Sequence, residues 1–208
     1  MEEVTIMEKG LFITFEGTDG CGKTTQIEML KDYFEKQGRT VLLTREPGAK
    51  GLGTKLREIL LNYDGEVSPV CESFLFLADR AQHVDTIIKP AVARGEIVLC
   101  DRHTDSTVAY QGYGRELDIE QIKMLNNIAT SGLKPDLTFI FDIDIDTAQK
   151  RVGKNKDRME SAGIEFFKRV RNGYLEIAKQ EPERVKVLDG SKAIETIHNE
   201  LLEILQTK

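Results

Sequence analysis

The chain has 208 residues, of which 40% are hydrophobic and 31% carry a charge. This length suits one domain with a real core and is too short for two of ordinary size, and the composition is that of a soluble globular protein. The formal net charge of −6 argues against bulk binding to nucleic acid or an anionic membrane, so a polyanionic ligand would need a local basic cluster.

Cysteine usage and the start of the chain indicate a cytoplasmic protein. The three cysteines, Cys21, Cys71 and Cys100, lie far apart without a C-x-x-C pair, which is typical of reduced thiols and not of disulfides or a zinc site. Residues 1–10 are acidic with few apolar side chains, so we expect a flexible leader and no signal peptide. No apolar run approaches the length that spans a bilayer, so we expect no membrane partner.

The first predicted elements are a strand, a glycine-rich turn and a helix. Residues 11–16 form an apolar run, and helical periodicity begins near Gln26. The sequence between them fits G-x-x-x-x-G-K-[ST], whose backbone N–H groups and helix N-terminus bind phosphate. Lys23 would then reach the β- and γ-phosphates of a nucleotide, and the Thr24 hydroxyl would coordinate Mg²⁺. The alternative is a turn that only starts a helix. The predicted phosphate-binding loop consists of Gly17, Thr18, Asp19, Gly20, Cys21, Gly22, Lys23, Thr24 and Thr25.

Short β-branched runs alternate with helical patterns along the rest of the chain. The further predicted strands are residues 40–44, 97–101, 137–142 and, more weakly, 184–188. The further predicted helices are residues 55–62, 69–94, with Pro90 kinking or shortening its end, and 119–130. This alternation predicts an α/β fold with a mostly parallel sheet covered on both faces, and ligands beyond the carboxyl ends of the strands.

Acidic residues end two of the predicted strands. Asp101 is followed at once by Arg102, which offers an acid for Mg²⁺-bound water and a base for phosphate, although backbone could also satisfy this carboxylate. Asp142 and Asp144 precede a helix, and we interpret them mainly as a turn and an N-cap. Asp19, inside the loop, could orient water or metal or simply stabilise the turn.

An aromatic and a guanidinium share one face of the helix predicted near residue 76. Phe76 and Arg80 are four positions apart, so their side chains are neighbours on a helix. The pair suits a flat base with carbonyl edges, because the ring stacks and the arginine donates to an oxygen. Taken alone, the pair would favour the alternative, in which Phe74 and Phe76 are core residues and Arg80 is a solvated partner of an acid.

Four segments together resemble the thymidylate kinase family, in its bacterial-type branch. They are residues 45–48, Phe76 with Arg80, residues 101–103, and residues 106–112, and their order and spacing after a phosphate-binding loop carry the resemblance. It extends from about residue 11 to residue 205. The resemblance implies a P-loop NTPase fold with a five-stranded parallel sheet and a mobile lid. It also implies transfer of the γ-phosphoryl of ATP, with Mg²⁺, to dTMP, and a homodimer formed through helices on one sheet face.

The resemblance implies that five matching residues contact the base and the sugar of dTMP. Phe76 would stack the thymine, Arg80 would bond its O4, and Gln111 would meet the base. Thr107 and Tyr110 match positions that crowd the 2′ carbon of the sugar and so favour deoxyribose.

The resemblance places the acceptor phosphate nearer the strand ends. Arg102, with Arg45 or Arg57, would hold that phosphate, and Glu46 belongs to the same substrate-binding side. His103 stands where the family usually has an aromatic, and we expect it to pack and not to transfer protons. The metal would be held by Thr24 and, through water, by Asp101.

A basic stretch over residues 150–163 is the predicted lid. Arg151 matches the family position that packs on adenine. The family's lid is rich in arginine, whereas lysines occupy positions 154 and 156 here, so we favour Arg158 as the cation that touches the transferred phosphoryl. The implied catalytic residues are Asp19, Lys23, Arg102 and Arg158.

Two other functions fit parts of the sequence. A P-loop kinase of a different pyrimidine nucleotide or of a deoxynucleoside would share the fold and the loop. A GTP-dependent switch would need an N-K-x-D motif at a strand end, but in residues 155–158 the aspartate comes one place early. The resemblance therefore favours the nucleotide kinase.

Overall fold

The computed structural model describes residues 9–151, 158–159 and 162–207. Most of the leader predicted over residues 1–10, and the part of the predicted lid that contains Lys154 and Lys156, lie outside the described residues. No helix in the described ranges combines the length and the apolar character needed to cross a membrane.

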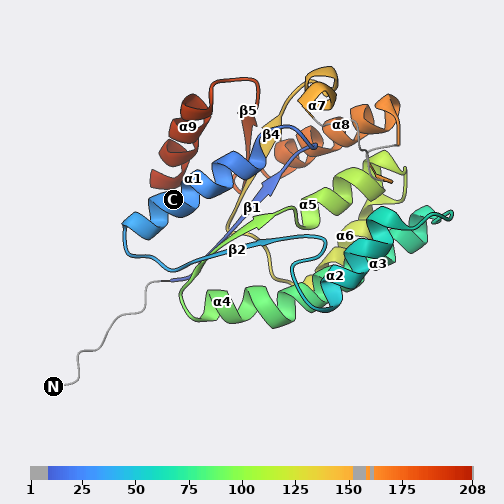
Figure 1. The fold of residues 1–208 in the computed structure, drawn as a ribbon, viewed down its shortest axis with the longest axis horizontal. Helices are drawn as coiled ribbons and strands as arrows, with labels where there is room; N and C mark the ends of the chain where they lie inside the picture. Colours follow the sequence, from blue (N-terminus) through green and yellow to red (C-terminus); the bar gives the residue numbers. More distant parts are fainter. Residues whose placement is uncertain (1–8, 152–157, 160–161, 208) are drawn as a thin grey trace.

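Five parallel strands form the centre of the molecule, in the order β2-β3-β1-β4-β5 (Figure 1). Their bounds are β1 (Leu11–Glu16), β2 (Val41–Arg45), β3 (Ile97–Asp101), β4 (Leu137–Asp142) and β5 (Val185–Asp189). The predicted parallel α/β sheet is confirmed, including its weak fifth strand. Because all strands run the same way, the residues that follow them meet at one edge.

Helices connect the strands on both faces of the sheet. The α-helices are α1 (Lys23–Lys36), α2 (Leu52–Asn62), α3 (Pro69–His83), α4 (Lys89–Ala93), α5 (Thr104–Thr107), α6 (Ile119–Thr130), α7 (Ile145–Arg151), α8 (Ile164–Gln180) and α9 (Ile194–Gln206), and the π-helical segments are η1 (Val84–Ile88) and η2 (Val108–Gly114). The helix predicted over residues 69–94 is divided into α3, η1 and α4. Pro90 has no N–H to continue the hydrogen-bond ladder of the preceding turn, which explains why the irregular segment lies just before it.

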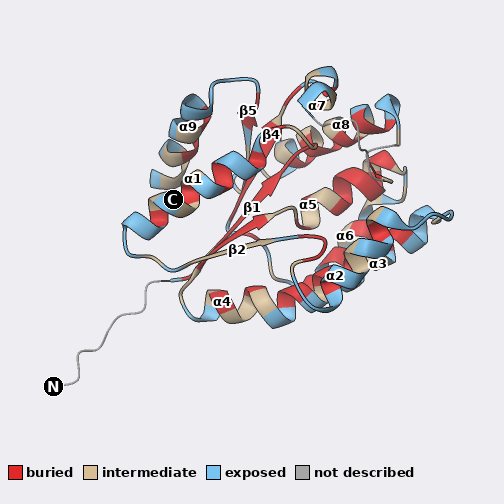
Figure 2. Cartoon of the chain, viewed as in Figure 1, coloured by how far each residue is buried: buried red, intermediate tan, exposed pale blue. Residues whose placement is uncertain are grey.

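Side chains of β1 enter the cores on both faces, which is why this strand reads as a continuous apolar run. Ile13 and Phe15 pack with α1 and α9, whereas Phe12 packs on the other face against η1 and α4. A third cluster joins η2, α6 and α8 through residues such as Tyr110 and Phe166. Figure 2 shows buried residues concentrated on the strands and on the inner sides of the helices. The edge at which the strands end therefore belongs to a sheet that helices cover on both faces.

Helix α8 packs closely against η2 at Gly173. A Cβ added to Gly173 of α8 would lie 2.7 Å from Cγ of Tyr113 on η2, near the fixed end of that side chain. Overpacking of this kind costs about 1–3 kcal/mol, so Gly173→Ala should lower the free energy of unfolding although alanine favours helix. Asn172→Ala, at the exposed neighbouring position, is the control. Urea unfolding of both variants measures the effect, and equal stability of the two would contradict the close packing.

Candidate active site

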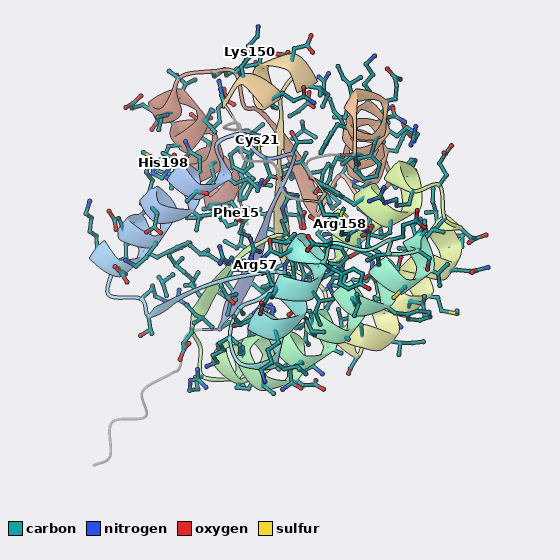
Figure 3. The ribbon with its side chains drawn as sticks, turned by 45° about the vertical axis from the view of Figure 1, so that its right-hand side comes forward. Phe15, Cys21, Arg57, Lys150, Arg158 and His198 are labelled. Atoms are coloured by element: carbon teal, nitrogen blue, oxygen red, sulfur yellow. The ribbon has the colours of Figure 1, made fainter. Side chains whose placement is uncertain are left out.

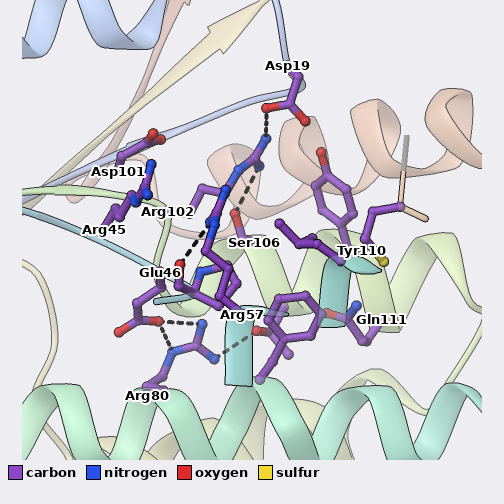
Figure 4. A pocket seen from close by; sticks show the side chains of 15 residues that line it. Asp19, Arg45, Glu46, Arg57, Arg80, Asp101, Arg102, Ser106, Tyr110 and Gln111 are labelled. Carbon is purple, nitrogen blue, oxygen red and sulfur yellow. Dashed lines mark hydrogen bonds and ion pairs between the residues drawn. The ribbon is translucent and has the colours of Figure 1, made fainter. Parts of the chain in front are cut away.

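A cavity opens at the carboxyl edge of the sheet (Figure 4). We call it the edge cavity. Its lining residues are Asp19, Arg45, Glu46, Pro47, Arg57, Leu61, Phe76, Arg80, Asp101, Arg102, Ser106, Thr107, Tyr110, Gln111 and Met159. All nine predicted acceptor-side residues are therefore brought together around one opening.

The loop that follows β1 has the backbone form that the motif predicts. Gly17 has φ 134° and a Cβ there would lie 2.7 Å from the Phe141 carbonyl oxygen, so only glycine fits without strain. Gly22, with φ 98°, precedes α1 and offers no side-chain cap, which leaves the first N–H groups of the helix for an anion. The Lys23 ammonium donates to the carbonyls of Gly17 and Thr18 at 3.0 and 3.2 Å. Lys23 would exchange these bonds for phosphate oxygens on binding.

Arg102 connects this loop to the edge cavity. Its backbone is left-handed, with φ 68°, a conformation that costs a residue with a side chain about 1–3 kcal/mol and occurs often at functional sites. Its guanidinium donates to Asp19 at 2.9 Å and lies over the ring of Tyr110, 5.2 Å from the centroid. Asp19, partly buried, has its pKa lowered to about 2, because the charges of Arg102 and Lys23 outweigh the opposing effect of burial. The loop carboxylate is therefore ionised and paired at neutral pH.

A group of residues behind Arg102 was missed by sequence reasoning. Glu16, at the end of β1, accepts from the Ser106 hydroxyl at 2.5 Å and from the Tyr174 hydroxyl of α8 at 3.2 Å. Both hydroxyl oxygens also accept from Nη1 of Arg102, at 3.4 and 3.3 Å. Burial, followed by the nearby charge of Asp105, raises the pKa of Glu16 to about 7. The one sign of this group in the sequence was that an acidic residue, Glu16, ends the buried apolar run of β1.

Arg80 is a buried hub and not a free cation. Nε donates to Glu46 at 2.8 Å, Nη1 to Thr107 and Asn126 at 2.7 and 2.6 Å, and Nη2 to the His103 carbonyl at 2.9 Å. Nη2 also lies 2.8 Å from the same Glu46 oxygen. Four of the five N–H donors of the guanidinium thus form hydrogen bonds within the protein, which sequence reasoning did not anticipate. A base oxygen would have to share or replace one of these bonds.

Glu46 is the carboxylate at the centre of the same hub. It is buried and accepts from His83 Nδ1 at 2.8 Å and from His103 Nδ1 at 3.0 Å, in addition to Arg80. Burial opposes ionisation, but the charge of Arg80 and these bonds hold the pKa of Glu46 well below its usual range. His103 also packs edge-on against Phe12, with ring centroids 5.1 Å apart, as expected of a packing residue.

The two other predicted phosphate ligands differ in exposure. Arg45 is exposed at the end of β2, whereas Arg57 of α2 donates to the Pro47 carbonyl at 2.9 Å. Both line the edge cavity with Phe76, which is half-buried on α3. Gln111 is buried and donates through Nε2 to Glu72 at 3.0 Å.

Arg158 lies beside α2 and α3 (Figure 3). Its backbone N–H donates to Leu61, Nε donates to the Leu60 carbonyl at 2.9 Å, and Nη1 donates to Glu72 at 2.7 Å. Glu72 was also missed by sequence reasoning, although it lies one helical turn before Phe76 on the same face. Arg158 would have to leave these partners to reach a transferred phosphoryl group.

The donor side contains further predicted residues. Nη1 of Arg151 donates to the carbonyls of Gly20 and Gly190 at 3.3 and 3.2 Å, and so bridges the phosphate-binding loop and the loop after β5. Asp144 accepts from the Thr147 N–H at 2.8 Å, which confirms it as a cap. Asp142, at the end of β4, accepts from Arg171 of α8 through both of its oxygens at 2.6 and 2.7 Å.

The oxygen ligands predicted for Mg²⁺ fit that ion. Asp101 Oδ1 is buried and has no hydrogen-bond partner among the described residues. Thr24 is exposed at the start of α1, where its hydroxyl can reach solvent and ligand. Within the described ranges no cluster of three metal-binding side chains occurs. Mg²⁺ usually binds few protein oxygens and completes its coordination with water and phosphate. The Thr24 hydroxyl and the Asp101 carboxylate therefore suit it.

Arg80→Ala should destabilise the fold strongly, because it leaves the buried Glu46 carboxylate without its guanidinium. Breaking a buried ion pair in this way costs about 3–5 kcal/mol. Arg45→Ala removes an exposed arginine from the same cavity and should change stability little. Urea unfolding of the two variants makes the comparison, and similar small losses would show that Arg80 is not the hub.

Glu16→Gln should change how stability depends on pH. Burial raises the pKa of the Glu16 carboxyl in the folded protein from its ordinary value of 4.5 to about 7, so its favourable contribution is complete below pH 4.5 and is lost as pH rises through about 7. The free energy of unfolding of wild type relative to the variant should therefore fall across this window. Glu28→Gln, at an exposed position of α1, is the control. A difference that is the same at low and neutral pH would refute the buried titration.

Known proteins match the chain over nearly its whole length. The family model for thymidylate kinase matches residues 15–201. Thymidylate kinase of Bifidobacterium longum (strain DJO10A) is 50% identical over 192 residues, covering 90% of this chain and 93% of that protein. Thymidylate kinase of Thermoanaerobacter sp. (strain X514) is 46% identical over 199 residues, covering 95% and 98%. The crystal structure of thymidylate kinase from Ehrlichia chaffeensis aligns with TM-score 0.78 and 38% identity over 95% of this chain and 99% of that one, which supports the predicted P-loop NTPase fold. The chain therefore belongs to the thymidylate kinase family.

Proposed function

We propose that the phosphate-binding loop is the donor site and the edge cavity the acceptor site of the family's reaction, ATP-dependent phosphorylation of dTMP to dTDP in nucleotide biosynthesis. The single observation that carries this assignment is Arg102, which lines the cavity and donates to Asp19 of the loop at 2.9 Å. A cation at that junction lies where two polyanions must meet. We infer that residues 1–208 act as one P-loop kinase domain.

On the donor side, ATP would bind along the N-terminus of α1. The loop amides and Lys23 would hold its phosphates, and the bridge from Arg151 to the loop after β5 supports adenine binding beside that arginine. Thr24 and, through water, Asp101 would hold Mg²⁺, which when bound neutralises phosphate charge. Asp19 would keep Arg102 oriented until the acceptor phosphate arrives.

On the acceptor side, the half-buried ring of Phe76 would stack the thymine, with Gln111 and Arg80 at the polar edge of the base. Tyr110 and Thr107 would crowd the 2′ carbon of the sugar. The bond from Arg80 to Thr107 supports an exchange in which a base oxygen takes one of the Arg80 donors.

The acceptor phosphate would lie at Arg102, with Arg45 or Arg57 as a second cation. A phosphate monoester has its second pKa near about 6, so at neutral pH it arrives mostly as a dianion and needs no general base. Catalysis then consists of aligning two polyanions and neutralising their charge. Arg158 is the proposed lid cation, on condition that it exchanges Glu72 for phosphate.

We also propose that the enzyme is a cytoplasmic homodimer. Helices α2, α3 and α6 expose large apolar side chains, among them Phe74, 55% exposed, and Ile128, 66% exposed. A second copy of this chain would bury them, as the family resemblance implies. The residues of this surface are Ile59, Val70, Phe74, Met124 and Ile128.

Coupled measurement of ADP release tests the proposal directly. We expect dTMP to be the preferred acceptor over dUMP, UMP, CMP and thymidine. Lys23→Ala should reduce turnover by about a thousandfold, because a cation at the transferred phosphoryl group contributes on that scale, while dTMP binding measured by calorimetry persists. Lys31→Ala, on the same helix beyond the loop, should retain activity. Full activity of Lys23→Ala, or preference for another acceptor, would refute the assignment.

A further inference from the structure

We propose that Glu72 is a specificity-determining positioning residue, which holds the carboxamide of Gln111 with its carbonyl oxygen toward the edge cavity. That oxygen selects pyrimidine bases that carry N–H at position 3 and rejects bases that carry a lone pair there. The inference rests on the proposed function and deepens it, because it assigns base selection to a residue that does not itself line the cavity.

Glu72 is an ionised carboxylate fixed from several directions. It is fully buried on α3, and Arg115 donates to it through Nε and Nη2, both at 3.1 Å, while Arg158 donates at 2.7 Å. Burial opposes ionisation, but the bonds from Arg115, Gln111 and Arg158 lower the pKa of Glu72. An ionised carboxylate accepts hydrogen bonds and cannot donate them. The atom of Gln111 that faces Glu72 must therefore be its NH₂ group.

The geometry leaves one polar atom of Gln111 for a ligand. Nε2 donates to Glu72 Oε1 at 3.0 Å, and among the described residues no group donates to Gln111 Oε1. This oxygen is not among the fully enclosed side-chain atoms that lack partners. Because Gln111 lines the edge cavity, its carbonyl oxygen is an acceptor available there (Figure 4).

An acceptor at this position distinguishes two kinds of pyrimidine. Thymine and uracil have N3–H, which can donate to the Gln111 oxygen, whereas N3 of cytosine carries a lone pair that would face it. A site built to hydrogen-bond a substrate N–H discriminates strongly against an analogue without it, because buried polar groups then stay unpaired. If the amide could turn over, its NH₂ group would suit cytosine. Glu72 prevents that turn.

Replacement of Glu72 by its amide tests this inference, because glutamine has the same shape and can donate as well as accept. The substrates are dTMP and 5-methyl-dCMP, which carry the same methyl group and differ at positions 3 and 4 of the base. We expect the ratio of kcat/KM for dTMP to that for 5-methyl-dCMP to fall at least about tenfold in Glu72→Gln, the value of one neutral hydrogen bond. A purely structural role would lower both values and leave their ratio unchanged.

Arg115→Met is the matched control. It removes two bonds to Glu72 but leaves the carboxylate and its bond from Gln111, so the ratio should remain that of wild type. If Glu72→Gln does not fold, as judged by thermal unfolding, wild-type protein supplies a second measurement. The side-chain NH₂ signals of Gln111 in nitrogen-15 spectra, identified by their loss in Gln111→Met, should be protected from solvent exchange with and without dTMP.

The outcomes separate this inference from the proposed function. Wild type without activity on dTMP would overturn the proposed function. Wild type that phosphorylates dTMP and 5-methyl-dCMP equally well, a folded Glu72→Gln variant with an unchanged ratio, or an unprotected Gln111 amide would overturn the role of Glu72 while leaving the dTMP kinase assignment intact.

Discussion

Four arginines near one edge of the sheet, Arg80, Arg102, Arg115 and Arg158, have side chains that are mostly buried and need a partner charge. The structure meets this constraint with three carboxylate partners: Arg102 donates to Asp19, Arg80 to Glu46, and both Arg115 and Arg158 to Glu72. Unpaired charges there would be costly, whereas paired ones hold the guanidinium groups in fixed positions. The edge cavity is therefore organised by ion pairs as much as by the strands that carry them.

These pairs divide into two kinds with different roles. Arg80 and Glu46 are fully buried and joined to two histidines, so they act as a rigid support under the cavity. Arg102 pairs with Asp19, whose side chain is 46% exposed, and its guanidinium faces the cavity. An exposed pair is more easily exchanged for a phosphate, since its partner can be rehydrated. In the proposed mechanism the first kind shapes the pocket and offers one Arg80 donor to the base, and the second binds the acceptor phosphate.

Much of the fold was predictable because its signals are local. The glycines and Lys23 of the phosphate-binding loop, the buried strands and the Asp101–Arg102 pair at a strand end all follow from short patterns, and parallel strands bring their ends to one edge. Pairing across long sequence separations was not predictable. Nothing in the sequence near Glu16 indicates that Tyr174 of α8 donates to it. Nor does the sequence near Asp142 indicate that Arg171 of α8 forms an ion pair with it. Likewise the spacing of Phe76 and Arg80 placed them on one helix face but could not show that Arg80 forms four hydrogen bonds to buried partners.

In the proposed reaction Arg102 receives the acceptor phosphate where the phosphate-binding loop meets the edge cavity. A crystal structure of the chain with dTMP and a non-hydrolysable ATP analogue tests it most directly. We expect the 5′-phosphate to contact the Arg102 guanidinium, in line with the donor, and the thymine to lie against Phe76. A thymidine nucleotide bound elsewhere, or a phosphate that does not contact Arg102, would contradict it.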